Sequence, residues 1–140
     1  MIEPAIYIKT SDCGDLISPD LHDSKLTAIR LNQGSVEFIF KLVSGELIVA
    51  ILDGVFRMCC NNFLEENIVL DMSIVTKRLV EKSELEQLLT PPKAQLDKHD
   101  SYIKEVQDKI LQGGLSFVEL NNSYGCQAYI LCNSVKFARL

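Results

Sequence analysis

The segment from Lys25 to Val75 alternates apolar and polar residues with a period of two, and this pattern constrains the fold more than any other feature of the chain. Between positions 36 and 42, for example, Val36 and Phe38 lie on one side together with two further apolar residues, whereas Glu37 lies on the other. Successive side chains of a β-strand point to opposite faces. The alternation therefore predicts antiparallel strands that each bury one face.

Short turn motifs divide this region into strands. Asn32-Gln33-Gly34 and Ser44-Gly45 separate the first runs, and residues 47–52 are apolar on both faces, as expected of a central strand. Asp53-Gly54 follows directly, and an Asp-Gly pair readily adopts the positive φ angles of a tight hairpin. We therefore predict that residues 55–60 pair back on 47–52. Short links favour pairing of consecutive strands, so a meander is the expected topology.

The period changes after Thr76. Ser83-x-x-Glu86 has the pattern of a capping box at the start of a helix, and Pro91-Pro92 would end that helix. A second helix is predicted from about residue 98 to 112, where Gly113-Gly114 stops it. Strands are further predicted at residues 5–10, 115–120, 127–132 and 135–139.

Together these elements predict an α+β fold. A curved, mainly antiparallel sheet of six to eight strands would be covered on one face by the two-helix segment near residues 80–112, because a sheet with one apolar face needs such a cover. The chain has 140 residues, which is an ordinary length for one domain, so residues 1–140 are expected to form a single domain.

The cysteines indicate a reducing compartment. There are five of them, an odd number, and none forms a C-x-x-C pair, so we expect free thiols and a cytoplasmic protein. Cys126 and Cys132 would share an apolar strand face, which favours packing over zinc binding. No secretory signal and no apolar run long enough to cross a membrane is recognisable. We expect neither a metal nor a cofactor.

The charge points to the kind of partner. The formal net charge is −5, and the densest basic cluster is the pair Lys77-Arg78. Nucleic-acid binding depends on phosphate neutralisation by Lys and Arg, so it is disfavoured, whereas a basic protein partner fits. Four aspartates fall within one predicted loop, which with His22 supplies the candidate binding residues: Asp12, Asp15, Asp20, His22 and Asp23.

His22 admits two interpretations. A histidine beside carboxylates and a hydroxyl is suited to general-base or metal chemistry, but Asp20 and Ser24 are also typical of a turn that precedes a strand. No complete set of catalytic residues is recognisable. The first functional hypothesis is a non-catalytic protein-binding module. The alternative is a small enzyme or ligand-binding protein that uses His22 with nearby carboxylates. A third is a subunit whose exposed strand edge pairs with a copy of itself, so a homo-oligomer stays open.

Four short motifs, in this order along the chain, carry a family resemblance: His22-Asp23-Ser24, Asp53-Gly54-Val55, Asn62-Phe63-x-x-x-Asn67-Ile68-Val69-Leu70-Asp71, and Tyr124-Gly125 before Leu131-Cys132. In this arrangement the chain resembles small bacterial proteins grouped as immunity-protein-like families of polymorphic toxin systems, and their uncharacterised relatives. The resemblance implies a single α+β domain that binds and blocks a toxin without catalysis. It transfers no catalytic residue.

Overall fold

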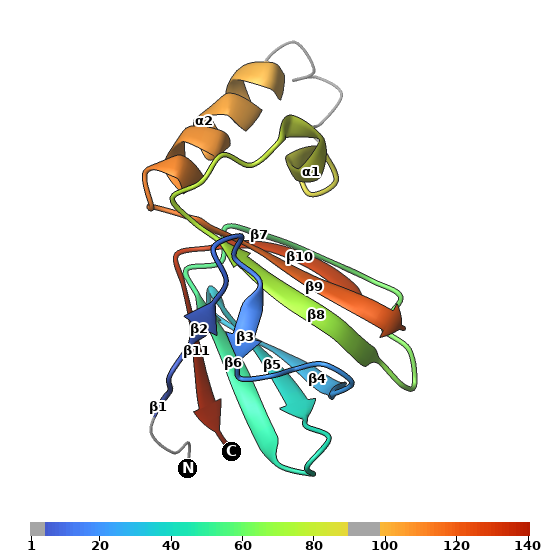
Figure 1. Cartoon of the computed structure of the whole chain (residues 1–140). Coiled ribbons are helices and arrows are strands. Elements are labelled where there is room, and N and C mark those ends of the chain that lie inside the picture. Colours follow the sequence, from blue (N-terminus) through green and yellow to red (C-terminus); the bar gives the residue numbers. More distant parts are fainter. Residues whose placement is uncertain (1–4, 90–98) are drawn as a thin grey trace.

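In the computed structural model of the chain, which describes residues 5–89 and 99–140, nine strands form one sheet that folds back on itself (Figure 1). The order across this sheet is β1-β11-β6-β5-β4-β8-β9-β10-β7, and every pairing is antiparallel. The bounds are β1 Ala5–Ile6, β4 Lys25–Asn32, β5 Ser35–Lys41, β6 Leu47–Asp53, β7 Arg57–Asn61, β8 Ile68–Val75, β9 Ser116–Tyr124, β10 Gln127–Cys132 and β11 Ser134–Arg139.

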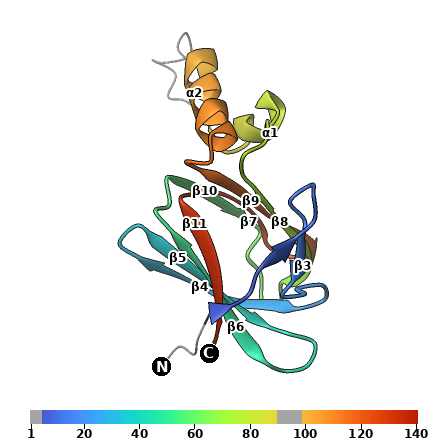
Figure 2. The same cartoon turned by 60° about the vertical axis from the view of Figure 1, so that its left-hand side comes forward.

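The sheet folds where β4 meets β8. These two strands are in register only at Lys25 and Ile68, so the five strands from β1 to β4 and the four from β8 to β7 form two layers (Figure 2). The main core lies between them. Phe38, Phe40 and Ile48 from the first layer and Val118 and Ile130 from the second are fully buried in one cluster. The two layers thus cover each other's apolar faces.

This arrangement confirms the α+β class and corrects two details. The described residues hold eleven strands rather than six to eight, because the predicted strand 5–10 is split into β1 and β2 (Lys9–Thr10), and β2 forms a separate hairpin with β3 (Leu16–Ser18) inside the predicted loop. The topology is not a simple meander, because β7 and β11 each pair with a strand distant in sequence.

The largest departure from the predicted meander is at the Asp53-Gly54 turn. The predicted hairpin is wrong: β6 pairs with β5 and β11, and β7 pairs with β10. The chain turns at Gly54, with φ 63°, and passes into the other layer. A Cβ atom on Gly54 would lie 2.7 Å from Cγ of Asn133, which begins the return crossing. Gly54 therefore serves a crowded crossover, where the two connections between the layers meet.

The helices cover less of the sheet than the pattern predicts. α1 (Lys82–Glu86) and α2 (His99–Leu111) lie at one end of the second layer in both views (Figures 1 and 2). Their apolar residues pack on Phe117 and Leu131, which face away from the main core. With 13 residues, α2 is only about 20 Å long, so the helices shield one end of that outer face, and the first layer covers the inner one.

The start of α1 also differs from the prediction. Glu81 is the N-cap, and its backbone N–H donates to Oε2 of Glu84 at 3.1 Å, so the capping box begins two residues before Ser83. The predicted stop at Pro91-Pro92 lies outside the described residues, and α1 ends before it. The helix predicted from about 98 to 112 is confirmed as α2.

Candidate functional site

His22 lies in the turn that leads into β4, and both of its ring nitrogens have neighbours. The backbone N–H of His22 donates to Oδ1 of Asp20 at 3.0 Å, and its Nδ1 lies 2.9 Å from the carbonyl oxygen of Leu70 in β8. Nε2 lies 3.5 Å from Oδ2 of Asp23. A carbonyl oxygen can only accept, so Nδ1 carries the hydrogen and donates it. The ring thus ties the turn to β8.

The same contacts favour the protonated ring. The hydrogen bond to Leu70 raises the pKa of His22 above its ordinary value, and the negative charges of Asp23, Asp20 and Asp71 raise it further. A small cavity of about 150 Å³ lies beside the ring, and Asp20 and Asp71 line it. The contacts of His22 therefore favour its protonated form, with the carboxylates around it supplying compensating charge.

A larger groove lies on the outer face of β8 and β9, next to this turn. Its volume is about 320 Å³, and four carboxylates line it: Asp15, Asp71, Glu84 and Glu119. They come from the hairpin of β2 and β3, from β8, from α1 and from β9. Because Asp71 lines both the groove and the cavity beside His22, the two form one continuous acidic surface.

Strand register places the central carboxylates of this groove. Asp71 is opposite Asn121, and Ser73 is opposite Glu119, so these side chains share the outer face. Asn121 Nδ2 donates to Asp71 Oδ1 at 2.7 Å, and Gln127 Nε2 donates to Asn121 Oδ1 at 2.6 Å. This chain of hydrogen bonds holds the Asp71 carboxylate in a fixed position.

Gly14 brings Asp15 to the groove. Its φ is 91°, and a Cβ atom there would lie 2.8 Å from the carbonyl oxygen of Ile74. Without that Cβ, the Gly14 carbonyl accepts the N–H of Ile74 at 2.8 Å, and Asp15 forms a β-bridge with Ser73. A glycine at this position thus allows the loop to dock on the edge of β8.

Glu119 is the groove carboxylate whose ionised form is disfavoured by its surroundings. Its side chain is half-buried, and desolvation raises its pKa, with further contributions from the charges of Glu84 and Asp71. Arg78 also lines the groove, yet within residues 5–89 and 99–140 it makes no ion pair with these carboxylates. The groove therefore holds negative charge that no described cation directly neutralises.

The predicted binding residues are only partly brought together. Asp15 lines the groove, Asp20 and His22 line the small cavity, and Asp23 contacts His22. Asp12 lies in the exposed turn before Gly14 and lines neither. Sequence reasoning missed the other groove carboxylates because Asp71 and Glu119 occupy polar positions of alternating strands and Glu84 lies in the first turn of α1, where acidic side chains are ordinarily solvated. Asp71 and Glu119 become distinctive only once register sets them side by side.

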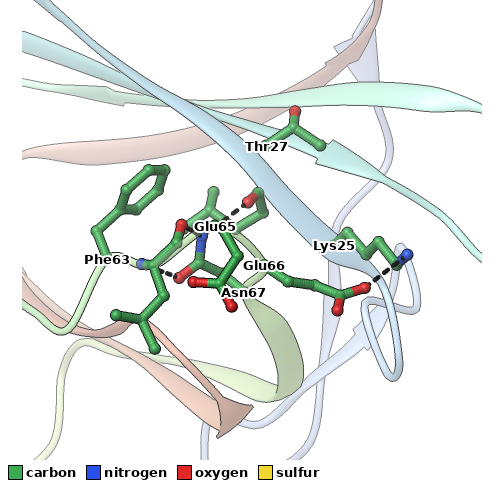
Figure 3. Close-up of a pocket in the computed structure, with 8 residues that line it drawn as sticks. Lys25, Thr27, Phe63, Glu65, Glu66 and Asn67 are labelled. Atoms are coloured by element: carbon green, nitrogen blue, oxygen red, sulfur yellow. Dashed lines mark hydrogen bonds and ion pairs between the residues drawn. The ribbon is translucent and has the colours of Figure 1, made fainter.

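A second pocket, of about 420 Å³, lies between the start of β4 and the segment 63–67 (Figure 3). Asn67 holds its wall: its Oδ1 accepts from the backbone N–H of Leu64 at 2.9 Å and of Cys126 at 3.0 Å. Across the entrance, Lys25 Nζ lies 2.8 Å from Glu66 Oε1. These contacts therefore fix the segment 63–67 beside the start of β4.

The cysteines differ in burial, from the exposed Cys13 to Cys126 and Cys132 in the core. All five are free thiols, and Cys126 and Cys132 are buried in the core as predicted. Contact with the Cys126 thiol and burial raise the pKa of Cys60, which opposes formation of a reactive thiolate. In the part of the chain that the structure describes, no group of three or more histidine, cysteine or acidic side chains could hold a metal ion.

Comparison with known proteins adds no relative: no family model, no curated protein and no solved structure matches the chain. Among the described helices, none has the length and apolar character required to span a bilayer. Function therefore has to be inferred from the geometry of the chain itself.

Proposed function

We propose that the protein is a non-catalytic protein-binding module whose acidic groove receives basic side chains of a partner. The observation that carries this proposal is Glu119, a half-buried carboxylate whose pKa is raised and which shares its groove with Asp15, Asp71 and Glu84. A lysine or arginine of a partner would compensate the charge of this poorly solvated carboxylate and offset its repulsion from the neighbouring carboxylates.

The family resemblance gives this role a specific form. Proteins of the immunity-like type bind and block a toxin, so the products of neighbouring genes are the first partners to test. We expect one of them to arrest growth when expressed alone, and co-expression of this protein to restore growth. If no neighbouring product is toxic or binds, the immunity role is wrong.

The groove is tested with a charge-matched pair of variants. Asp71→Asn combined with Glu119→Gln removes two negative charges and preserves hydrogen-bonding shape, whereas Glu105→Gln with Asp108→Asn removes two from the exposed side of α2. We expect the groove variant to associate more slowly with the captured partner at low salt and to approach wild type as salt rises. Equal rates for both variants would exclude the groove.

The acidic loop is tested separately. Neutralising Asp12, Asp15, Asp20 and Asp23 as asparagine should slow association if the loop forms part of the interface. An unchanged rate with a folded variant would remove the loop, including Asp15, from the interface and leave only Asp71, Glu84 and Glu119 of the groove. Loss of folding would assign these carboxylates to turns, consistent with the hydrogen bond that Asp20 accepts from His22.

A ligand-binding role for His22 is the second candidate, because the cavity of about 150 Å³ beside the ring is also lined by Asp20 and Asp71. His22→Gln separates the two roles. The variant should bind the protein partner with affinity close to wild type if the groove carries binding, whereas a small ligand held by the imidazole would be lost.

A further inference from the structure

In the described part of the chain, the edge of β4 from Ala28 to Asn32 has no strand beside it, whereas the outward backbone groups of Leu26 bond to Asn67. β4 pairs with β5 along its length, whereas among the described residues it pairs with β8 only at Lys25. Asn32 and Ser35 close a two-residue turn, so they form a hydrogen-bonded pair. Because backbone groups alternate in direction along a strand, the N–H and C=O groups of Ile29 and Leu31 point away from β5, toward the open side.

Apolar side chains of the core face are uncovered at this edge. Ile29 lies opposite Phe38 and Leu31 opposite Val36, and both of those partners are buried. Leu31 nevertheless is 70% exposed. Met58, in the edge strand β7 of the other layer, packs on the same core as Ile29 and is also only half-buried. Apolar side chains on the core face of β4 are therefore partly exposed to solvent where this strand is unpaired.

The open edge continues into the pocket of about 420 Å³ between Lys25–Thr27 and the segment 63–67. Figure 3 shows Phe63 on the side of this pocket opposite Lys25. Two ion pairs at the edge balance their own charges: Lys25 pairs with Glu66, and Arg30 pairs with Glu37. In the described part of the chain Glu65 forms no ion pair, and its carboxylate accepts a hydrogen bond from the Tyr124 hydroxyl at 3.3 Å. One negative charge is therefore left at the pocket end.

We propose that this edge binds an extended segment of a partner protein, which adds a strand beside β4. The segment would alternate apolar residues, which cover Ile29 and Leu31, with polar residues that face solvent, and a lysine or arginine would reach Glu65. Strand addition supplies affinity through backbone hydrogen bonds and specificity through alternate side chains. This inference rests on the proposed protein-binding role but assigns it a surface separate from the acidic groove.

A second copy of the chain fits this edge less well. In antiparallel self-pairing that sets Ile29 opposite Leu31 of the other copy, Arg30 would face Arg30, and directly opposed like charges are destabilising. Shifting the register to set Ile29 opposite Ile29 would bring Leu31 against the bulge of β4 between Leu26 and Ala28, where the ladder is locally disrupted. The geometry therefore favours a different partner sequence.

The test uses a synthetic peptide of about ten residues, enough for a strand of ordinary length, that alternates valine and threonine and ends in two lysines. A second peptide, with proline at alternate positions, serves as the control because it cannot complete the ladder. Hydrogen exchange of the whole protein is followed by NMR. We expect the first peptide to slow exchange of the Ile29 and Leu31 amides at least about tenfold at saturation, and the proline peptide to leave it unchanged.

Two variants, at apolar side chains of similar exposure, identify the surface that binds the peptide. Leu31→Lys removes the uncovered side chain at the edge, whereas Val43→Lys changes a residue that is 77% exposed in the turn between β5 and β6. We expect only Leu31→Lys to weaken peptide binding, by about tenfold or more, which corresponds to loss of a buried leucine contact. Both variants are checked for native spectra, and Leu31→Ala replaces Leu31→Lys if the lysine variant does not fold.

Three results would overturn the inference. Absence of binding, or equal weakening by both variants, would show that the edge accepts no strand. Peptide-induced shifts at Asp71 and Glu119 instead of β4 would place binding in the groove, in which case the proposed function stands and this inference fails. Protection of Ile29 and Leu31 that rises with protein concentration alone would assign the edge to a second copy.

Discussion

The Nδ1 atom of His22 lies 2.9 Å from the carbonyl oxygen of Leu70, which joins the turn before β4 to the strand across the fold of the sheet. The ring is therefore part of the corner where the two layers meet. Its charge state and the stability of that corner are linked, since the carboxylates of Asp20, Asp23 and Asp71 also act on it.

We predict that His22 titrates above 6.5, its ordinary value. A pKa raised in the folded state means that the protonated ring stabilises the fold; this contribution is complete below 6.5 and is lost as the pH rises through the folded-state pKa. An NMR titration of the ring, assigned with His22→Gln, measures the pKa directly. A value at or below 6.5 would contradict the hydrogen bond and the acidic surroundings.

We predict that Glu119→Gln stabilises the protein at neutral pH. The raised pKa of Glu119 means that its ionised form costs stability above the folded-state pKa, and that the cost disappears as the pH falls below the unfolded value near 4.5. Urea unfolding at pH 7 and at pH 4 should show a gain at the first and little difference at the second. Asp108→Asn, an exposed residue of α2, is the control and should change neither.

Gly125 is predicted to be intolerant of a side chain. Its φ is 88°, and a Cβ atom would lie 2.5 Å from Oδ1 of Asn67, the acceptor that holds the 63–67 segment. Gly125→Ala should therefore destabilise by about 2 kcal/mol or more, from strain and a lost buried hydrogen bond. Gly45, with φ 91° and nothing within 4 Å of its Cβ position, is the matched control.

The control variant isolates the contact from the backbone strain. Gly45→Ala should cost only about 1 kcal/mol, since a positive φ is its sole penalty. Chemical unfolding of both variants gives the comparison. Equal losses would show that the packing of Gly125 on Asn67 adds nothing to stability.

The thiols give a fourth prediction. A thiol reagent should find five free groups in the denatured, non-reduced protein, because all five cysteines are unpaired. In the native protein Cys13 should react first, as it is exposed, and Cys132 much more slowly, since it is buried and burial raises its pKa to about 12. A denatured count of one or three would show that disulfides form and would contradict the expected reducing compartment.

Local patterns predicted the strands better than their partners. The turns at Gly34 and Gly45, the buried central strand β6 and the helix α2 all follow from periodicity and turn chemistry, which act over a few residues. The pairing of β7 with β10 and of β11 with β6 does not, because it depends on contacts between distant segments. Asp53-Gly54 shows the limit: the chain does turn at Gly54, but pairing with the distant strand β10 takes β7 into the other layer instead of back onto β6.

The candidate site was predictable to the same degree. His22 and Asp20 stood out because they are clustered in sequence, and they are neighbours in the structure. Asp71 and Glu119 were not recognised, since each has the ordinary polar place in an alternating strand. What distinguishes Glu119 is desolvation and the nearness of Glu84 and Asp71, and both follow from the fold rather than from any local motif.

The position of β11 between β6 and β1 has a consequence for the order of folding. β6 is buried on both faces, yet one of its edges is completed only by β11, which the ribosome makes after the helices and the whole second layer. Until then a nascent chain presents an apolar strand with an unpaired edge, the kind of surface that promotes aggregation. Such non-local pairing also predicts slow folding, so the newly made chain has a window in which a chaperone is of use.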